Sequence, residues 1–372
     1  MNNNPLSNLI KELKKDKKNK AVLVSSFSNI VYLTSYTGFS KEEREAYLFV
    51  TKNNQYILTD ARYSEAVKTL VSDFKLIEIS LNNPVKKVLK HLVKKHRIKH
   101  VAFEGHDISF LEHKKLLMDF NDSNHRSLES LRIIKTAEEI SKIEKACNIG
   151  DDAFKHILKR IKLGISEKEV AYEIEFFIKK QGADLSFRTI VAFGKNSAVP
   201  HHLTSDKRLA ISDKLILLDF GVKYNNYCSD MTRTIFFGPA NAELKKMYNT
   251  VLEAQARSIS LLNSLFMIHN SIPAKSIDKA ARDYITSQGY KTIPHGLGHG
   301  VGIEVHEAPH LSPKSEDILK EGMVFSIEPG IYIPEVGGVR IEDLVVLEKK
   351  GLPRRKASPR LLTHSTSGLI EL

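Results

Sequence analysis

The most constraining feature of this sequence is a carboxylate at the end of a strongly apolar segment. Asp219 directly follows residues 215–218, whose composition is typical of a buried β-strand. Because an unpaired buried charge costs several kcal/mol, this position requires a compensating partner. A second carboxylate, Asp230, opens another predicted strand eleven residues later, beyond a turn-prone segment. We therefore expect a hairpin centred near residues 224 and 225, in which the two aspartates lie directly opposite each other on one face.

A second pair of carboxylates follows the same pattern. Glu328 ends one apolar run and Glu342 lies inside another, and the midpoint between them, residue 335, precedes a Gly-Gly pair. This spacing predicts a second hairpin with its two acids facing each other. Arg340 is two residues from Glu342, so the two side chains share a face of the strand.

A glycine-rich segment with histidines lies between the two acidic pairs. Four of the seven residues 296–302 are glycine, which lets the backbone pass close to a bulky neighbour. Their spacing does not match the dinucleotide-binding fingerprint or the phosphate-binding loop. Three histidines accompany them instead: His295, His299 and His306.

Four strand-borne carboxylates and one imidazole form a suitable set of ligands for two divalent cations. Oxygen donors with a single nitrogen suit Mn²⁺, Co²⁺, Zn²⁺ or Fe²⁺. Two such ions about 3.5–4 Å apart can hold a bridging hydroxide and polarise a carbonyl, which is the chemistry of a hydrolase. Taken singly, each acid or histidine is more typical of a turn, a cap or an ion pair, but their combination predicts a metal site.

The pattern of apolar residues predicts two domains, residues 1–134 and 135–372. The first alternates short strands with helices, as in an α/β domain. A capping box formed by Thr136 and Glu139 begins a helix that extends to about residue 162. Further helices are predicted at 166–181, 241–264 and 275–288, and strands at 215–219, 232–237, 324–327 and 339–347.

The composition excludes several classes of function. The net charge of +12 raises nucleic acid as a partner, but the lysines follow the polar faces of helices such as residues 85–95, and no nucleic-acid-binding motif is present. No apolar run approaches the ~20 residues that span a membrane, and the first residues lack the apolar segment of a secretory signal. With only two cysteines, we expect a cytoplasmic enzyme without membrane or nucleic-acid partners.

These motifs resemble the pita-bread metallopeptidases, the family of Xaa-Pro aminopeptidase and Xaa-Pro dipeptidase. The resemblance implies a mixed α/β (α+β) fold, in which a creatinase/prolidase-type N-terminal α/β domain precedes a pita-bread domain with an antiparallel sheet and flanking helices. It rests on these segments of the second domain: 219–221, 229–234, 295–302, 305–309, 327–332 and 339–343. It also rests on these segments of the first: 29–34, 36–39 and 59–63.

Carried over residue by residue, the resemblance implies a role for each metal ligand. Asp219 would bind one ion only, while Asp230 and Glu342 would bridge both ions. His299 and Glu328 would complete the second ion. The two divalent ions are expected to be Mn²⁺ first, with Co²⁺, Zn²⁺ and Fe²⁺ as alternatives.

The resemblance also implies roles beyond the ligands. Glu328 would carry the proton to the leaving nitrogen, and His306 would contact the scissile carbonyl. His295 would line the substrate pocket, and Arg340 would support the site. The family histidine that follows a proline would be His201, although the spacing to the first aspartate is one residue longer than usual and leaves His202 open.

The implied function is that of an Xaa-Pro aminopeptidase. Such an enzyme hydrolyses the bond between an N-terminal residue and a following proline, using a hydroxide held between two metal ions. The alternative is an Xaa-Pro dipeptidase (prolidase), and a more remote one is a metal-free pita-bread binding module or a creatinase-like enzyme. Proline-containing peptides are the expected substrates, and a homodimer is the expected assembly.

Overall fold

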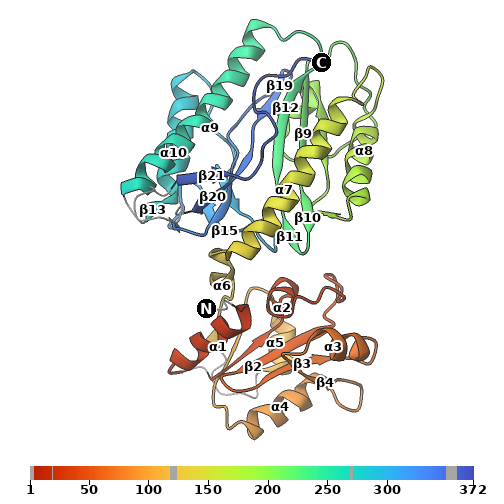
Figure 1. Cartoon of the computed structure of the whole chain (residues 1–372), viewed down its shortest axis with the longest axis vertical. Coiled ribbons are helices and arrows are strands. Elements are labelled where there is room, and N and C mark those ends of the chain that lie inside the picture. The colour runs from red at the N-terminus through yellow and green to blue at the C-terminus, as the bar shows by residue number, and fades with distance from the viewer. Residues whose placement is uncertain (1–3, 19, 118–123, 269–270, 349–357) are drawn as a thin grey trace. The chain divides into compact units, whose positions relative to one another are not determined.

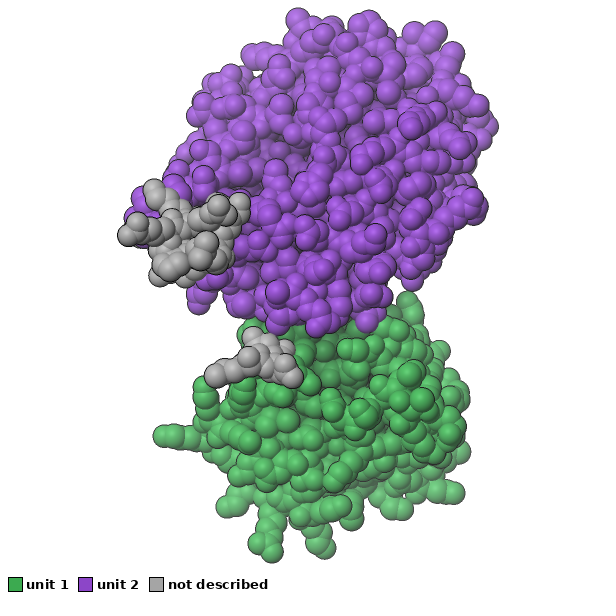
Figure 2. Space-filling model, in the orientation of Figure 1, with its two compact units in different colours: residues 1–132 green, residues 133–372 purple. Residues whose placement is uncertain are grey.

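The computed structural model describes residues 4–18, 20–117, 124–268, 271–348 and 358–372. The chain divides into two compact units, residues 1–132 and 133–372, which Figure 2 colours separately. Within the described ranges, no helix combines the length and the apolar character needed to cross a membrane.

The first unit contains a six-stranded mixed sheet in the order β4-β3-β2-β1-β5-β6 (Figure 1). Its strands are β1 (Ala21–Val24), β2 (Ala46–Thr51), β3 (Gln55–Thr59), β4 (Lys75–Glu78), β5 (Val101–Phe103) and β6 (Asn124–His125). Its helices are α1 (Pro5–Lys15), α2 (Phe27–Thr34), α3 (Ser64–Leu70), α4 (Val85–Lys95) and α5 (Phe110–Leu116), and the short α6 (Ser130–Ile133) follows at the boundary. Helix α4 buries Val88, Leu89 and Leu92. Its lysines fall on the other side, as expected of a solvated helix face.

The second unit consists of antiparallel sheets covered by two pairs of helices. The helices are α7 (Ala137–Leu158), α8 (Glu167–Lys180), α9 (Ala242–Ile268) and α10 (Ala274–Ser287). One sheet has the order β12-β9-β8, with β8 (Ile190–Phe193), β9 (Leu215–Phe220) and β12 (Met231–Phe236). Another has the order β15-β14-β17-β20-β21, with β14 (Gly298–Gly300), β15 (Glu307–Leu311), β17 (Val324–Ile327), β20 (Asp343–Glu348) and β21 (Ser358–Leu361).

Shorter elements complete this unit. Strands β18 (Gly330–Ile333) and β19 (Gly337–Arg340) form a separate hairpin. The remaining elements are β7 (Asp184–Leu185), β10 (Val222–Tyr224), β11 (Tyr227–Cys228), β13 (Ile272–Pro273), β16 (Ile318–Leu319) and the 3₁₀ helix η1 (Gly194–Ala198).

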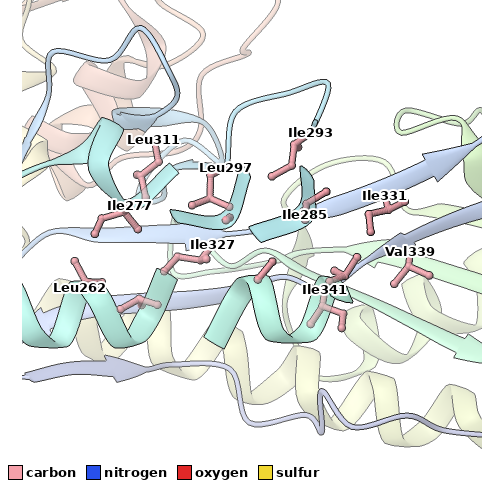
Figure 3. Close-up of a cluster of buried hydrophobic side chains, with 14 of the residues drawn as sticks. Leu262, Ile277, Ile285, Ile293, Leu297, Leu311, Ile327, Ile331, Val339 and Ile341 are labelled. Carbon is pink, nitrogen blue, oxygen red and sulfur yellow. The ribbon is translucent and has the colours of Figure 1, made fainter. Parts of the chain in front are cut away.

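Two hydrophobic cores hold the helices of the second unit against its sheets. One joins α7 and α8 to β8, β9 and β12. The other joins α9 and α10 to the strand segments that flank the second acidic pair. Figure 3 shows Leu262 and Ile277 of these helices in one cluster with Ile327 and Ile341. Both cores lie on the helix side of the sheets, so the opposite face of the strands is left for other contacts.

The start of α7 confirms the predicted capping box. The Thr136 backbone N–H donates to Glu139 Oε2 at 2.8 Å, and the Glu139 backbone N–H donates to Thr136 Oγ1 at 3.3 Å. These two bonds satisfy donors that have no partner inside the helix. The helix ends at Leu158, a few residues before the predicted end.

The prediction that Asp219 faces Asp230 directly is wrong. Asp219 pairs with Thr232 instead, so Asp230 is its diagonal neighbour on the same face. The turn falls on Asn225 and Asn226, both with positive φ, as a two-residue hairpin loop requires. The midpoint between the two aspartates had predicted a turn at residues 224 and 225, one position before the observed turn.

The predicted strand 339–347 is two strands. It is interrupted at Ile341 and Glu342, where the chain leaves the hairpin with β18 and joins the sheet beside β17. The register on both sides of the break is the expected one, because Ile327 pairs with Asp343 and Gly330 pairs with Arg340. Glu328 and Glu342 therefore lie at matching positions in this hairpin.

Candidate metal centre

All nine site residues predicted from the sequence line one cavity of about 640 Å³ in the second unit. They are His201, Asp219, Asp230, His295, His299, His306, Glu328, Arg340 and Glu342. A cavity of this size suits a small molecule or a short peptide. The floor is acidic and buried, whereas His201 and His306 are exposed at its opening.

The alternation of side chains along the strands explains why the acids reach the cavity. Ile327 and Ile341 belong to the hydrophobic core that α9 and α10 share with the strands (Figure 3). Glu328 and Glu342 follow these residues directly, and the next side chain along an extended chain points the opposite way. The apolar residues thus anchor the strands, and the carboxylates are presented on the other side.

The carboxylates and His299 converge in overlapping groups. Ligand atoms of Asp219, Asp230 and Glu342 all lie within 4.8 Å of one another, and so do those of His299, Glu328 and Glu342. His299 Nε2 lies 3.4 Å from Glu328 Oε1 and 3.7 Å from Asp230 Oδ2. These spacings bring all five predicted ligands into one cluster.

Two buried carboxylate oxygens in this cluster have no hydrogen-bond partner among the described residues. They are Asp230 Oδ1 and Glu342 Oε1. Burial, followed by repulsion from the neighbouring acids, raises the pKa of Glu342 to about 8 and raises the pKa of Asp230 well above its usual range. A divalent cation would provide the missing partner and offset the repulsion, so these residues fit a metal ion.

Two neutral hydroxyls that were not predicted from the sequence orient the acids. Thr232 Oγ1 donates to Glu342 Oε2 at 2.7 Å, and Ser326 Oγ donates to Glu328 Oε1 at 3.3 Å. Such outer hydrogen bonds fix the rotamer of a ligand and tune its basicity. Their position was a usable signal, because Ser326 and Thr232 each lie two residues from an acid of the site.

Arg340 neutralises Asp219 at one end of the cluster. Its Nη2 lies 2.5 Å from Asp219 Oδ2, and Nη1 donates to Tyr332 Oη at 2.9 Å. The Tyr332 hydroxyl lies 2.9 Å from His295 Nε2, while His295 Nδ1 lies 2.7 Å from the carbonyl oxygen of Gly296. Since a carbonyl only accepts, Nδ1 carries the proton and Tyr332 donates to Nε2. Burial lowers the pKa of His295, in agreement with a neutral ring.

The glycine-rich segment brings His299 between two other strands. A side chain at Gly298 would collide with the carbonyl oxygen of Ser326, and one at Gly300 with that of Ala308. The bulky neighbour expected from the sequence is therefore the backbone of β17 on one side and of β15 on the other. The carbonyl of Gly300, 3.2 Å from His299 Nδ1, accepts from that nitrogen and leaves Nε2 facing the carboxylates.

The structure separates the two adjacent histidines that the sequence left as alternatives. His201 lines the cavity. His202 Nε2 instead lies 2.8 Å from Oε2 of Glu167, a fully buried carboxylate outside the cavity lining. On the other wall, the His306 ring stands edge-on to His299 at 4.1 Å between centroids, and burial lowers the pKa of His306.

Comparison with known proteins identifies the family. The family model for metallopeptidase family M24 matches residues 141–349, and that for the creatinase/prolidase N-terminal domain matches residues 6–134. The chain is 39% identical over 357 residues to a Bacillus subtilis (strain 168) protein named Uncharacterized peptidase YqhT, covering 94% of this chain and 95% of that protein.

Two solved structures are similar over almost their whole length. An Xaa-Pro dipeptidase from Bacillus anthracis has 35% sequence identity and a TM-score of 0.85, with 100% of this chain and 99% of that chain covered. An X-Pro aminopeptidase from Thermotoga maritima MSB8 has 32% identity and a TM-score of 0.86, with 99% of each chain covered. The predicted fold is confirmed: a creatinase-type α/β domain is followed along the chain by a pita-bread domain. The chain belongs to metallopeptidase family M24, a family of hydrolases that use divalent metal ions.

Proposed function

We propose that this chain is an Xaa-Pro aminopeptidase, which hydrolyses the peptide bond between an N-terminal residue and a following proline. The observation that carries the proposal is the cluster of acids around His299, in a cavity whose walls hold His201, His295 and His306. The names of the two solved relatives, X-Pro aminopeptidase and Xaa-Pro dipeptidase, support specificity for proline.

Five residues would hold two divalent metal ions. Asp219 would bind one ion, Asp230 and Glu342 would contribute to both, and His299 and Glu328 would complete the second. The grouping of ligand atoms supports this division, because Glu342 belongs to the group with Asp219 and to the group with Glu328. Asp230 likewise belongs to the group with Asp219 and to another with His299.

Mn²⁺ is the ion we expect, because hard oxygen donors dominate the set. When bound, the ions act as Lewis acids and make a water molecule nucleophilic at neutral pH. A metal-free binding module or a creatinase-like enzyme is a poorer fit, because it would leave the buried oxygens of Asp230 and Glu342 without a partner.

The remaining side chains would bind the peptide and move its proton. Glu328 takes a proton from the attacking water and delivers it to the leaving proline nitrogen. His306 donates a hydrogen bond to the carbonyl oxygen as negative charge develops there. His201 and His295 contact the substrate from the cavity walls, and Arg340 holds Asp219 in place.

The main alternative is an Xaa-Pro dipeptidase, which cleaves only dipeptides. We favour the aminopeptidase because three exposed residues, His201, His306 and His310, line the cavity, so that a peptide longer than two residues could extend toward solvent. We also propose that the protein forms a homodimer, as the resemblance to this family implies.

A short peptide panel tests the length and residue preference. With Mn²⁺, we expect the protein to cleave Ala-Pro-Ala and to leave Ala-Ala-Ala essentially intact, because only the first places a proline ring at the leaving nitrogen. Liquid chromatography of the products measures both rates, with Gly-Pro as a third substrate. Cleavage of Gly-Pro alone would establish the dipeptidase, and equal cleavage of Ala-Ala-Ala would contradict specificity for proline.

Removal of the metal should make stability depend on pH. The folded-state pKa values of Glu342, about 8, and of Asp230 lie above their ordinary values, so the metal-free protein is most stable at low pH and loses stability as pH rises toward 8. Bound Mn²⁺ offsets this repulsion, so the gain in melting temperature on adding Mn²⁺ should grow between pH 5 and pH 8. Calorimetry of metal-free and Mn²⁺-loaded protein measures the gain; a gain that shrinks with pH would contradict this assignment.

A further inference from the structure

Glu167, at the first position of α8, is a buried carboxylate that does not belong to the metal cluster. It is 0% exposed and accepts five hydrogen bonds. The donors are the Phe193 backbone N–H (2.9 Å), Asn196 Nδ2 (2.8 Å), His202 Nε2 (2.8 Å), the Ser205 backbone N–H (2.9 Å) and Ser205 Oγ (2.6 Å). Five donors on one ionised carboxylate form a strong, charge-assisted clamp.

The ionised form of Glu167 fits this environment. Burial acts to raise its pKa, but the hydrogen bonds from Ser205, His202, Phe193 and Asn196 outweigh burial and lower the pKa below its usual value. The carboxylate also lies at the N-terminal end of a 14-residue helix, where negative charge is favoured. The clamp therefore stays charged, and all of its partners donate to it.

All of these donors lie in one segment, residues 193–205, which contains η1 and His201. The segment is attached on its other side to β19. The Gly338 backbone N–H donates to Ser197 Oγ at 2.8 Å, and Arg340 Nη1 donates to the Pro200 carbonyl at 3.2 Å. Glu167 thus holds both ends of the segment, and β19 holds the part between them against the cavity.

His201 itself has no hydrogen bond to another residue of the described ranges, so its backbone determines where the imidazole lies. The ring lines the same cavity as Asp219 of the metal cluster and His306. A small shift of residues 196–202 would move the ring directly, because no hydrogen bond of its side chain within the described residues retains it. The Glu167 clamp opposes this shift with five hydrogen bonds.

We propose that Glu167 is a positioning residue that acts through His201: it holds residues 193–205 so that the His201 imidazole meets the substrate. The inference rests on the proposed function, in which His201 contacts the peptide. If Glu167 had a purely structural role, its replacement would lower stability by the same amount with and without the His201 side chain. The two roles are separated by the coupling between Glu167 and His201.

A double-mutant cycle on the Mn²⁺-loaded protein measures that coupling. We expect Glu167→Gln to lower kcat/KM for Ala-Pro-Ala by about 10–100-fold, as is typical when a residue that orients an active-site group is lost. His201→Ala should change the same kinetic parameter as Glu167→Gln, in the same direction: a raised KM or a lowered kcat. In the His201→Ala background, Glu167→Gln should then cost less than about 3-fold, because the histidine it positions is gone. A double variant whose loss in kcat/KM equals the product of the two single losses would overturn the inference.

Glu169→Gln is the matched control, because Glu169 lies two residues further along α8 and accepts from the Ser166 backbone N–H at 2.7 Å. This substitution should weaken the start of α8. It should not be coupled to His201→Ala in kcat/KM. If Glu167→Gln does not fold, His202→Phe takes its place in the same cycle, because a phenyl ring has no N–H to donate to Glu167. Multiplicative losses with this variant would also overturn the inference.

Failure of the proposed function would be visible separately. A wild-type protein that cleaves no Xaa-Pro peptide with Mn²⁺ would contradict the aminopeptidase, whatever Glu167 does. The cycle is then measured by calorimetry as affinity for the dipeptide Ala-Pro. The same non-additive pattern would support positioning, and additive or absent effects of Glu167→Gln and His201→Ala would overturn it.

Discussion

Replacement of Asp230 by asparagine is expected to lower kcat/KM for Ala-Pro-Ala by more than about 100-fold, beyond the 10–100-fold loss typical of groups that only support a ligand. Asp230 is buried and belongs to two overlapping groups of ligand atoms, one with Asp219 and Glu342 and one with His299 and His306. Its charge would therefore contribute to both proposed ions. The metal content of the purified variant should fall in parallel. Steady-state kinetics and elemental analysis of the same preparation measure the two losses.

The same substitution should have the opposite effect on the metal-free protein. Repulsion from Glu342 and burial both disfavour the ionised Asp230, so asparagine should raise the melting temperature of the metal-free form. Asp152→Asn is the control, because Asp152 is 62% exposed and its pair with Lys155 contributes little. A variant at Asp230 that keeps both its metal and its turnover would contradict the ligand assignment.

Replacement of Arg340 by methionine is expected to destabilise the metal-free protein by about 3–5 kcal/mol, the usual cost of breaking a buried ion pair from one side. The guanidinium contacts Asp219 at 2.5 Å, and both side chains are almost fully buried. It also donates to Thr232 Oγ1 and Tyr332 Oη, which would lose this partner. Urea denaturation of the metal-free variant measures the loss in the free energy of unfolding.

The control for this prediction is Arg257→Met. Arg257 pairs with Glu253 at 2.8 Å, but the two side chains are 54% and 46% exposed, and pairs of this kind contribute at most about 1 kcal/mol. A loss at Arg340 no larger than that at Arg257 would contradict the view that Arg340 neutralises a buried acid of the site.

Local patterns in the sequence predicted the elements better than they predicted the first hairpin. The register that brings Glu328 and Glu342 together follows from symmetry about residue 335, and the structure has this register on both sides of the pair. The same counting failed for Asp219, because it did not include the preference of Asn225 and Asn226 for the left-handed turn conformation. Acids separated by a diagonal still share a face, so the error changed the register without removing Asp219 from the cavity.

Contacts between distant segments could not be predicted from patterns of apolar and charged residues. Glu167 lies 35 residues before His202, and in the sequence it resembles any acid in the first turn of a helix. Only the folded chain shows that Glu167 forms a hydrogen bond with His202, while His201 lines the cavity. Thr232 and Ser326 are neutral, so a pattern of charged residues does not reveal them. Their spacing of two residues from Asp230 and Glu328 was the one signal in the sequence.

Titration of the metal-free protein with Mn²⁺ tests the central claim most directly. Calorimetry counts the ions bound per chain, and hydrolysis of Ala-Pro-Ala is followed at each point of the titration. We predict that two ions bind per chain and that turnover rises with their occupancy from a metal-free baseline near zero. Full hydrolysis by the metal-free protein, or no saturable binding of Mn²⁺ in a protein that hydrolyses the peptide, would contradict the account.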